Sequence, residues 1–159
     1  MGEAYLRSYK QEYDLDYTIF RFFNTYGPDQ SPDFVINKFI SSALDNKDIT
    51  IYGDGKQTRT FCFIDDNIEA TLNAFNKNLI VNDVANIGND IEISIMELAK
   101  IIIEITGSKS KIVHLPPLKE GDMTRRKPDI TNMKKLLGGR KLLSIEDGIK
   151  KILTTKNRH

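Results

Sequence analysis

The sequence of 159 residues has few of the features that would restrict its class. Its single cysteine, Cys62, excludes an intrachain disulfide framework and is typical of a reducing compartment. Its 23 basic and 22 acidic residues leave a net charge of +1, so charge gives no case for nucleic-acid binding. No apolar run approaches the roughly 20 residues that span a bilayer, and the N-terminus lacks signal-peptide and transit-peptide patterns. We therefore expect a soluble, cytoplasmic globular protein with neither nucleic acid nor membrane as a partner.

The sequence does contain alternating strand-like and helix-like segments. Short β-branched or aromatic runs predict strands, and apolar residues at a spacing of three and four predict helices. The predicted strands cover residues 17–23, 49–52, 58–64, 84–87 and 111–115, and the predicted helices cover residues 4–13, 34–44, 66–75, 95–106, 131–137 and 144–153. This order is typical of an α/β protein with a largely parallel sheet, and we expect the apolar runs 17–23 and 84–87 to form neighbouring parallel strands in it.

Two of the predicted helices have recognisable start signals. Ser94, followed three residues later by Glu97, matches a capping box, and Gly107 ends the same helix. Asp65 or Asp66 is expected to cap the helix before it. The inner residues of that earlier helix are expected to be Ile68, Ala70, Leu72 and Phe75.

Two patterns look like dehydrogenase signatures but lack the structural setting that these need. Gly53-Asp-Gly55 begins like the dinucleotide-binding G-x-G-x-x-G, but it has no third glycine and lies between two predicted strands. Tyr52 and Lys56 have the spacing of a Tyr-x-x-x-Lys acid/base pair, which requires a helical turn to stack lysine beside phenol. We interpret this segment as a hairpin turn.

Other reactive side chains give little support for a catalytic or metal site. His114 and His159 are 45 residues apart, and neither has a second ligand at helical spacing. Cys62 lies between two phenylalanines, which indicates a small apolar filler. No serine has a recognisable base partner, so we predict neither a metal site nor a catalytic residue.

The arginines are more informative. Arg59 lies in a predicted strand between two threonines, and Arg125 and Arg126 lie in a polar stretch. The planar guanidinium fork suits phosphate oxygens, although a single strand arginine is more often a salt-bridge partner. Both interpretations stay open from the residues alone.

Several motifs occur in order along nearly the whole chain. They are Arg21-Phe-Phe-Asn-Thr-Tyr-Gly-Pro28, residues 51–66, Asn86-Ile-Gly88, residues 121–130 and Ser144-Ile-Glu-Asp-Gly148. Together they resemble the nucleotide-sugar epimerases, dehydratases and decarboxylases of the extended short-chain dehydrogenase/reductase family. Within it, the resemblance is nearest to UDP-glucuronate decarboxylase.

The resemblance implies the C-terminal half of such an enzyme. Gly2-Glu3 match the last two positions of the family's Y-x-x-x-K-x-x-G-E catalytic helix. Residues 1–28 then correspond to a remnant of the nucleotide-binding domain, with the end of the catalytic helix and the sixth strand. Residues 29–159 correspond to a small α/β substrate-binding lobe, in which about residues 65–89 return to the Rossmann-type parallel sheet.

The resemblance also implies a binding site for a nucleotide sugar, most simply a UDP-sugar. Asn24 resembles an asparagine that contacts the phosphates, Tyr52 lies where the family has a residue near the base, and Arg59 resembles the arginine that binds the pyrophosphate. Arg126 matches the decarboxylase spacing for a second phosphate arginine, and Arg125 matches that of related epimerases. We expect Arg59 and at least one of these two to converge on one cleft, with Asn24 at its rim.

The resemblance implies NAD as the cofactor of the intact enzyme, but no NAD is expected to bind this chain alone, and the chain alone is expected to be inactive. The alternatives are a non-catalytic nucleotide-sugar-binding or interaction module, and an inert truncated fragment. Tyr5, Tyr9 and Tyr13 form an aromatic stripe on the first predicted helix. A homodimer through this helix is a further expectation.

Overall fold

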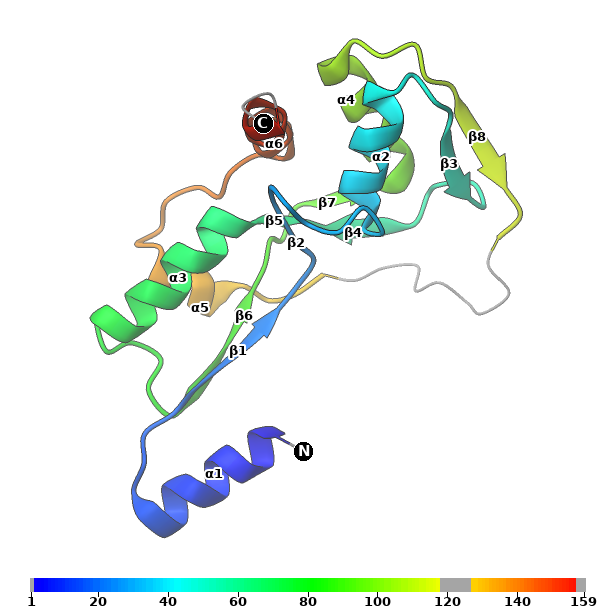
Figure 1. Ribbon diagram of the computed structural model, residues 1–159. Coiled ribbons are helices and arrows are strands. Elements are labelled where there is room, and N and C mark those ends of the chain that lie inside the picture. The colour runs from blue at the N-terminus through cyan, green and yellow to red at the C-terminus, as the bar shows by residue number, and fades with distance from the viewer. Residues whose placement is uncertain (1, 118–126, 157–159) are drawn as a thin grey trace.

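The computed structural model describes residues 2–117 and 127–156, and its elements alternate along the chain (Figure 1). The helices are α1 (Gly2–Tyr13), α2 (Val35–Leu44), α3 (Ile64–Asn76), α4 (Ile95–Thr106), α5 (Thr131–Leu136) and α6 (Ile145–Lys156). The strands are β1 (Thr18–Phe22), β2 (Thr25–Tyr26), β3 (Ile49–Tyr52), β4 (Thr58–Thr60), β5 (Cys62–Phe63), β6 (Asp83–Ile87), β7 (Glu92–Ser94) and β8 (Ile112–Leu115). The predicted α/β class is confirmed.

The strands pair two by two rather than forming one continuous sheet. β1 runs parallel to β6, with Thr18 opposite Asp83 and Phe22 opposite Ile87, which confirms the predicted pairing of these segments. β2 with β5 and β3 with β8 are also parallel, whereas β4 and β7 are antiparallel. The largely parallel character is therefore also confirmed for the described residues.

Two predictions about residues 49–64 are wrong. The expected single strand at 58–64 is divided at Phe61, because β4 pairs with β7 while β5 pairs with β2. The expected hairpin at Gly53-Asp-Gly55 is a turn between strands that do not pair with each other, since β3 pairs with β8. In both cases the partner strand lies far away in the sequence, where local residue patterns carry no information about it.

The main core lies between α2, α4, α6 and β3, at the upper end of the view in Figure 1. Helix α2 buries Phe39 and Ile40, α4 buries Leu98 and Ile102, and β3 buries alternate residues. Each fully buried aliphatic side chain contributes about 1.5–3 kcal/mol by leaving water. The predicted capping box is confirmed in α4, and Gly107 ends that helix in the left-handed conformation with φ 63°.

Helix α3 has an orientation that its sequence did not predict. Its buried residues are Asp66, Asn67, Ala70 and Ala74. Of the four expected inner residues, only Ala70 is buried, whereas Ile68, Leu72 and Phe75 are exposed. The expected aspartate cap is also wrong, because Phe63 is the N-cap and both aspartates lie inside the first turn. The small alanine face is the one that packs on the second core cluster, with Ala85 and Met133.

Helix α6 packs closely on β2 through a glycine. A Cβ atom built on Gly148 would lie 2.0 Å from the hydroxyl oxygen of Tyr26, so no other residue fits here without displacing that ring. Tyr26 is almost fully buried, and its ring meets Phe63 edge-on at 5.3 Å between centroids. The C-terminal helix is thereby fixed against the segment that follows β1.

Helix α1 stands apart at the opposite end of the molecule (Figure 1). It has no buried residue among those described, and Tyr5, Tyr9 and Tyr13 are all exposed. A bidentate ion pair joins Glu3 to Arg21 of β1, with oxygen–nitrogen distances of 2.6 and 2.7 Å. None of the helices in the described ranges is long and apolar enough to cross a membrane.

Candidate functional site

Three of the five predicted site residues line one cavity of about 340 Å³. Asn24 follows β1, Tyr52 ends β3 and Arg59 is the central residue of β4. The other two, Arg125 and Arg126, lie outside the described residues, so their convergence with Arg59 stays a prediction. The cavity therefore gathers polar and cationic groups from segments that are distant in sequence.

Asn24 is held in place by bonds on both sides. Its side-chain Nδ2 donates to the carbonyl oxygen of Thr60 at 2.9 Å, and its own carbonyl oxygen accepts from the Cys62 amide at 3.1 Å. Its backbone has φ 35°, a left-handed conformation that asparagine tolerates better than most residues. These bonds attach the segment after β1 to the junction of β4 and β5. Arg59, which also lines the cavity, lies directly before this junction.

Tyr52 reaches the cavity from the end of β3, just before a tight turn. Gly53 and Gly55 both have positive φ, and a Cβ on Gly55 would lie 3.2 Å from the Met96 Cβ. The turn caps α4, because the carbonyl oxygen of Gly55 accepts from the Met96 amide at 3.1 Å. The glycines thus serve a close contact between turn and helix. The Tyr52 ring is left 41% exposed at the cavity wall.

Arg59 is half-buried in β4, opposite Ile93 of β7. One guanidinium nitrogen donates to the Thr58 carbonyl oxygen at 2.8 Å. A guanidinium has five N–H donors in a planar fork, which matches the oxygens of a phosphate group. The bond to the Thr58 carbonyl oxygen restricts the orientation of this fork.

Sequence reasoning missed other polar groups of this cavity. Asp33 and Lys38 line it from the start of α2, and Gln57 lines it from the turn before β4. Gln57 also donates from Nε2 to the Tyr52 carbonyl oxygen at 3.3 Å. Gln57 lies inside a quoted motif, so a signal existed for it. For Lys38 the sequence gives no such signal, because a lysine on an amphipathic helix normally lies on the solvent side.

A second cavity, of about 370 Å³, adjoins the first. Both include Asn24, Val35 and Phe61 in their linings. The second is completed by residues of β1, β2 and the loop to α2, including Phe22, Gln30 and Phe34. The described residues that line it include no Asp, Glu, Lys, Arg or His, so their side chains carry no formal charge near neutral pH. Burial also raises the pKa of the Tyr26 phenol above its ordinary value of 10.0.

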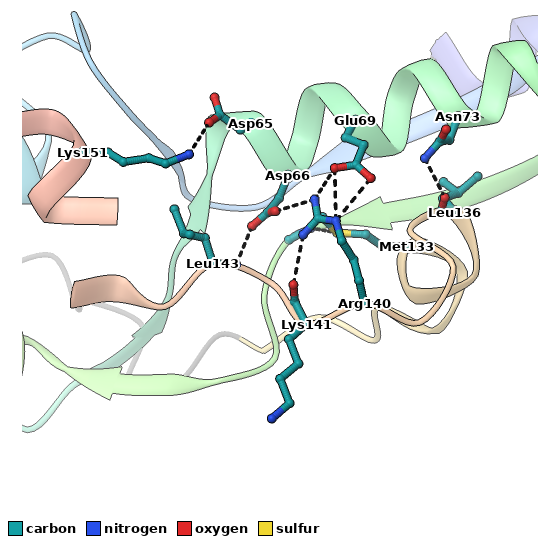
Figure 2. A network of polar contacts seen from close by, with 11 residues as sticks. Asp65, Asp66, Glu69, Asn73, Met133, Leu136, Arg140, Lys141, Leu143 and Lys151 are labelled. Carbon is teal, nitrogen blue, oxygen red and sulfur yellow. Dashed lines mark hydrogen bonds and ion pairs between the residues drawn. The ribbon is translucent and has the colours of Figure 1, made fainter. Parts of the chain in front are cut away.

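A polar network outside both cavities joins α3 to the segment between α5 and α6 (Figure 2). The Asp66 carboxylate, almost fully buried, accepts from the Leu143 amide at 2.9 Å and pairs with Arg140 at 2.8 Å. Arg140 also donates to Glu69, and this hydrogen bond lowers the pKa of the Glu69 carboxyl below 4.5. The network holds the chain in place before α6 begins.

The remaining reactive side chains have structural surroundings. Burial, reinforced by the nearby Asp66 charge, raises the pKa of the Cys62 thiol to about 12, so it stays protonated near neutral pH. His114 has its Nδ1 2.7 Å from the carbonyl oxygen of Gly53, bridging β8 to the turn after β3. Across residues 2–117 and 127–156 there is no cluster of three or more His, Cys, Asp or Glu that could hold a metal ion.

The fold and the comparisons with known proteins agree on the class. Parallel strand pairs flanked by helices, with Asn24 and Tyr52 of the cavity at the ends of β1 and β3, are the arrangement of Rossmann-type α/β proteins. The model of the NAD dependent epimerase/dehydratase family matches residues 1–88, more than half of the sequence. The chain belongs to that family.

Curated relatives match nearly the whole chain. It is 40% identical over 147 residues to UDP-N-acetyl-alpha-D-glucosaminuronate decarboxylase of Bacillus cytotoxicus, covering 87% of this chain and 46% of the relative. It is 36% identical over 150 residues to UDP-glucuronic acid decarboxylase 4 of Arabidopsis thaliana, covering 93% of this chain and 33% of the relative. The chain thus spans between a third and a half of the length of these relatives.

Solved structures extend the likeness to the fold. A UDP-glucose 4-epimerase of Thermotoga maritima, solved with UDP-glucose, superposes with a TM-score of 0.88 at 34% identity, covering 98% of this chain and 50% of that one. A UDP-glucuronic acid 4-epimerase of Bacillus cereus, solved with UDP-glucuronic acid and NAD, gives 0.84 at 31% identity, covering 99% and 51%. The predicted Rossmann-type class is confirmed by these superpositions.

Proposed function

We propose that these 159 residues form the nucleotide-sugar-binding portion of a UDP-sugar epimerase, dehydratase or decarboxylase. The observation that carries the proposal is the cavity that brings Asn24, Tyr52 and Arg59 together from three separate segments. Relatives solved with UDP-glucose and with UDP-glucuronic acid support the choice of a UDP-sugar. The division into residues 1–28 and a lobe of 29–159 is part of this proposal.

Each cavity residue has a role suited to its chemistry. Arg59 binds the pyrophosphate through its guanidinium fork, with Arg125 or Arg126 as the proposed second cation. Asn24 contacts the phosphates from the end of β1. Tyr52, with its exposed ring, lies beside the base, where an aromatic face can stack on it.

The described residues do not fit NAD. A dinucleotide is held by a glycine-rich loop between a strand and a helix N-terminus, whereas Gly53-Asp-Gly55 joins β3 to β4. In addition, Tyr52 and Lys56 lie across this turn rather than on a helix. We therefore propose that this chain by itself neither binds NAD nor catalyses a reaction.

Calorimetric titration with UDP tests the proposal. Replacing Arg59 by methionine should weaken UDP binding by about 1–3 kcal/mol, because a charge-assisted bond to phosphate is lost. Arg7→Met, at an exposed position on α1, is the matched control and should bind UDP like the wild-type chain. Absence of UDP binding to the wild-type chain would support the inert-fragment alternative, and equal binding by both variants would remove Arg59 from the site.

A role as an interaction module is favoured by one further observation. The aromatic stripe of Tyr5, Tyr9 and Tyr13 is exposed on a helix that has no buried residue among those described. We propose that this face forms a homodimer contact, since contiguous exposed apolar surface marks association sites. Sedimentation equilibrium should show a dimer that Tyr9→Ser weakens, and a strict monomer at high concentration would contradict this proposal.

A further inference from the structure

Strand β1 uses only one of its two edges in the described part of the chain, where it pairs with β6 alone over its full length. The Phe23 amide donates to the Ile87 carbonyl oxygen at 2.9 Å, and the Tyr17 carbonyl oxygen accepts from the residue before β6 at 2.6 Å. Odd-numbered residues therefore direct their main-chain groups to β6. Because the peptide groups of a strand alternate in direction, even-numbered residues direct theirs to the opposite side. This open edge consists of the N–H and C=O groups of Thr18, Phe20 and Phe22.

The sequence of β1 is that of an interior strand. Edge strands are normally protected by proline, by inward-pointing charges or by bulges, which keep other chains from pairing with them. Thr-Ile-Phe-Arg-Phe has no proline, and its register with β6 has no bulge. Its one charged side chain, Arg21, is paired with Glu3 of α1. Such a nearly continuous apolar run is typical of strands that are covered on both faces and paired on both edges. The open edge is therefore suited to accept a further strand.

Helices α1 and α3 lie on opposite faces of the β1–β6 pair (Figure 1). Arg21 links β1 to α1, whereas its neighbour Phe20 packs on the core cluster that includes Ala70 and Ala74 of α3. Neighbouring side chains of a strand point to opposite faces of a sheet. A strand added at the open edge would thus extend a layer that already has a helix on each face, which is the setting of a parallel sheet.

The α3 side of the open edge is hollow and apolar. A cavity of about 600 Å³ lies between β1 and α3, and its lining includes Phe20, Leu72 and Phe75. Leu72 and Phe75 continue a row that starts at Ile68, and all three side chains are at least half exposed. Residues at positions i, i+4 and i+7 share one face of a helix, which is the pattern that packs on a second helix. We call this row the α3 stripe.

The open edge and the α3 stripe together define the chemistry of a partner. A strand that runs parallel to its neighbour needs a crossover connection, usually a helix, and that helix packs on a face of the sheet. The edge can therefore take a strand while the stripe takes a helix of the same polypeptide. An extended peptide alone would leave the stripe exposed, and a small molecule would leave the edge unpaired. The partner is thus a polypeptide of alternating strands and helices.

The comparisons point to such a polypeptide. The chain matches the C-terminal half of its curated relatives, and its superposition on the Thermotoga maritima epimerase covers 50% of that enzyme. An enzyme of that length contains a further segment about as long as this chain. We infer that the open edge and the α3 stripe form one docking surface, and that its occupant is the N-terminal half of an enzyme of this family, bound as a separate polypeptide. The inference goes beyond the proposed function and does not require UDP binding.

Co-expression with a defined partner tests the docking. The full 159-residue chain is co-expressed with the part of the Bacillus cytotoxicus decarboxylase that precedes its matched stretch, so that a partner half which folds only on docking is also captured. We expect a one-to-one complex, with a dissociation constant measured by sedimentation of diluted samples. Hydrogen exchange at the amides of Thr18, Phe20 and Phe22 should be at least roughly tenfold slower in the complex than in the chain alone.

Two substitutions of Phe22 isolate the main-chain bonds of the open edge. Phe22→Pro removes an N–H that points away from β6, so the β1–β6 pairing loses no bond. Phe22→Ala removes the same exposed ring but keeps the N–H, and is the matched control. The dissociation constant of the complex should be roughly tenfold higher for the proline variant than for the alanine variant.

A second pair of substitutions tests the α3 stripe. Leu72→Asp places a charge in the proposed helix contact and should raise the dissociation constant roughly tenfold or more. Leu44→Asp is the matched control, because Leu44 is exposed to a similar extent on α2, outside the docking surface. It should leave the dissociation constant within twofold of the wild-type value.

The outcomes separate this inference from the proposed function. A complex that Phe22→Pro and Leu72→Asp weaken more than their controls supports the docking surface. No complex on co-expression, or a complex in which neither variant differs from its control, overturns it. A homodimer of this chain with slow exchange at the open edge would assign the surface to a second copy and also overturns it. UDP binding enters none of these measurements, so a failure of the proposed function leaves them unaffected.

Discussion

Helices α2 and α3 are both amphipathic, but α2 buries its large apolar side chains and α3 does not. Helix α2 buries Phe39 and Ile40 in the main core, whereas α3 buries Asp66 and Asn67 and exposes Leu72 and Phe75. Apolar periodicity predicts that a helix exists, but not which of its faces the rest of the chain covers. The lobe around α2 is therefore stabilised by its own core, and the region around α3 depends on small alanines and a polar network.

The largest effect should separate two leucines that look alike in the sequence. Leu98 of α4 is fully buried, so Leu98→Ala should lower the free energy of unfolding by about 2–5 kcal/mol. Leu72 of α3 is 54% exposed, and Leu72→Ala should cost less than about 1 kcal/mol. Urea unfolding of both variants makes the comparison. If both variants lose the same free energy of unfolding, the Leu72 face of α3 is buried in solution, and the difference between the two helical regions does not hold.

The next effect concerns the polar network. Arg140→Met leaves the buried Asp66 carboxylate without its cation, which should cost on the order of 1–3 kcal/mol, since Arg140 is partly exposed and water screens some of the loss. Lys47→Met is the control, because its partner Asp45 is exposed and the pair should contribute less than about 1 kcal/mol. If Arg140→Met lowers the free energy of unfolding no more than Lys47→Met does, the alanine contacts alone hold α3 in place.

The same variant should change the pH dependence of stability. Arg140 lowers the pKa of Glu69 below its ordinary 4.5, so the stability from this pair is present above that value and is lost as pH falls through the lower folded value. The stability gap between wild type and Arg140→Met should therefore be full at pH 7 and narrow towards pH 3. A constant gap over this range, measured by urea unfolding, would show that Glu69 takes no part.

The capping box of α4 tests the stability of the region around the main core. Ser94→Ala removes the capping box of α4 and should cost about 1 kcal/mol, because the Glu97 amide of the first turn loses its acceptor. Ser8→Ala, on exposed α1, is the matched control and should be nearly neutral. Thermal unfolding of the pair measures the difference. Similar losses would indicate a general serine effect rather than capping.

The smallest effect on stability should come from the exposed face of α3. Phe75 is 85% exposed, so Phe75→Ser should change the free energy of unfolding by less than about 0.5 kcal/mol. It should, however, reduce binding of a fluorescent hydrophobic dye, because Phe75 and Leu72 line a cavity with Phe20 of β1. A destabilisation as large as that of Leu98→Ala would place Phe75 in a core.

Much of the site followed from the sequence because its residues lie in ordered motifs. The segment ending in Asn24 and the segment with Tyr52 and Arg59 both resemble family motifs, and the structure brings these three residues to one cavity. Their binding roles stay predictions. The pairing of β1 with β6 followed from two short apolar runs of the kind that parallel strands need.

The errors share one physical cause, which is dependence on distant partners. Apart from Arg59 and Cys62, the run from Thr58 to Ile64 is β-branched or aromatic, so it does not reveal that the partner changes from β7 to β2. Likewise, the orientation of α3 is set by Ala85 and Met133, whose approach no local pattern specifies.

Because Gly148 has no side chain, helix α6 packs directly against Tyr26, which lines the second cavity. Because α6 rests directly on the Tyr26 hydroxyl, and Tyr26 lines that cavity, local unfolding of α6 removes the packing behind one of its walls. A ligand that needs this wall binds only the closed population and so suppresses the opening. Amide hydrogens of α6 should then exchange more slowly when a ligand occupies the second cavity, although the helix itself need not touch the ligand.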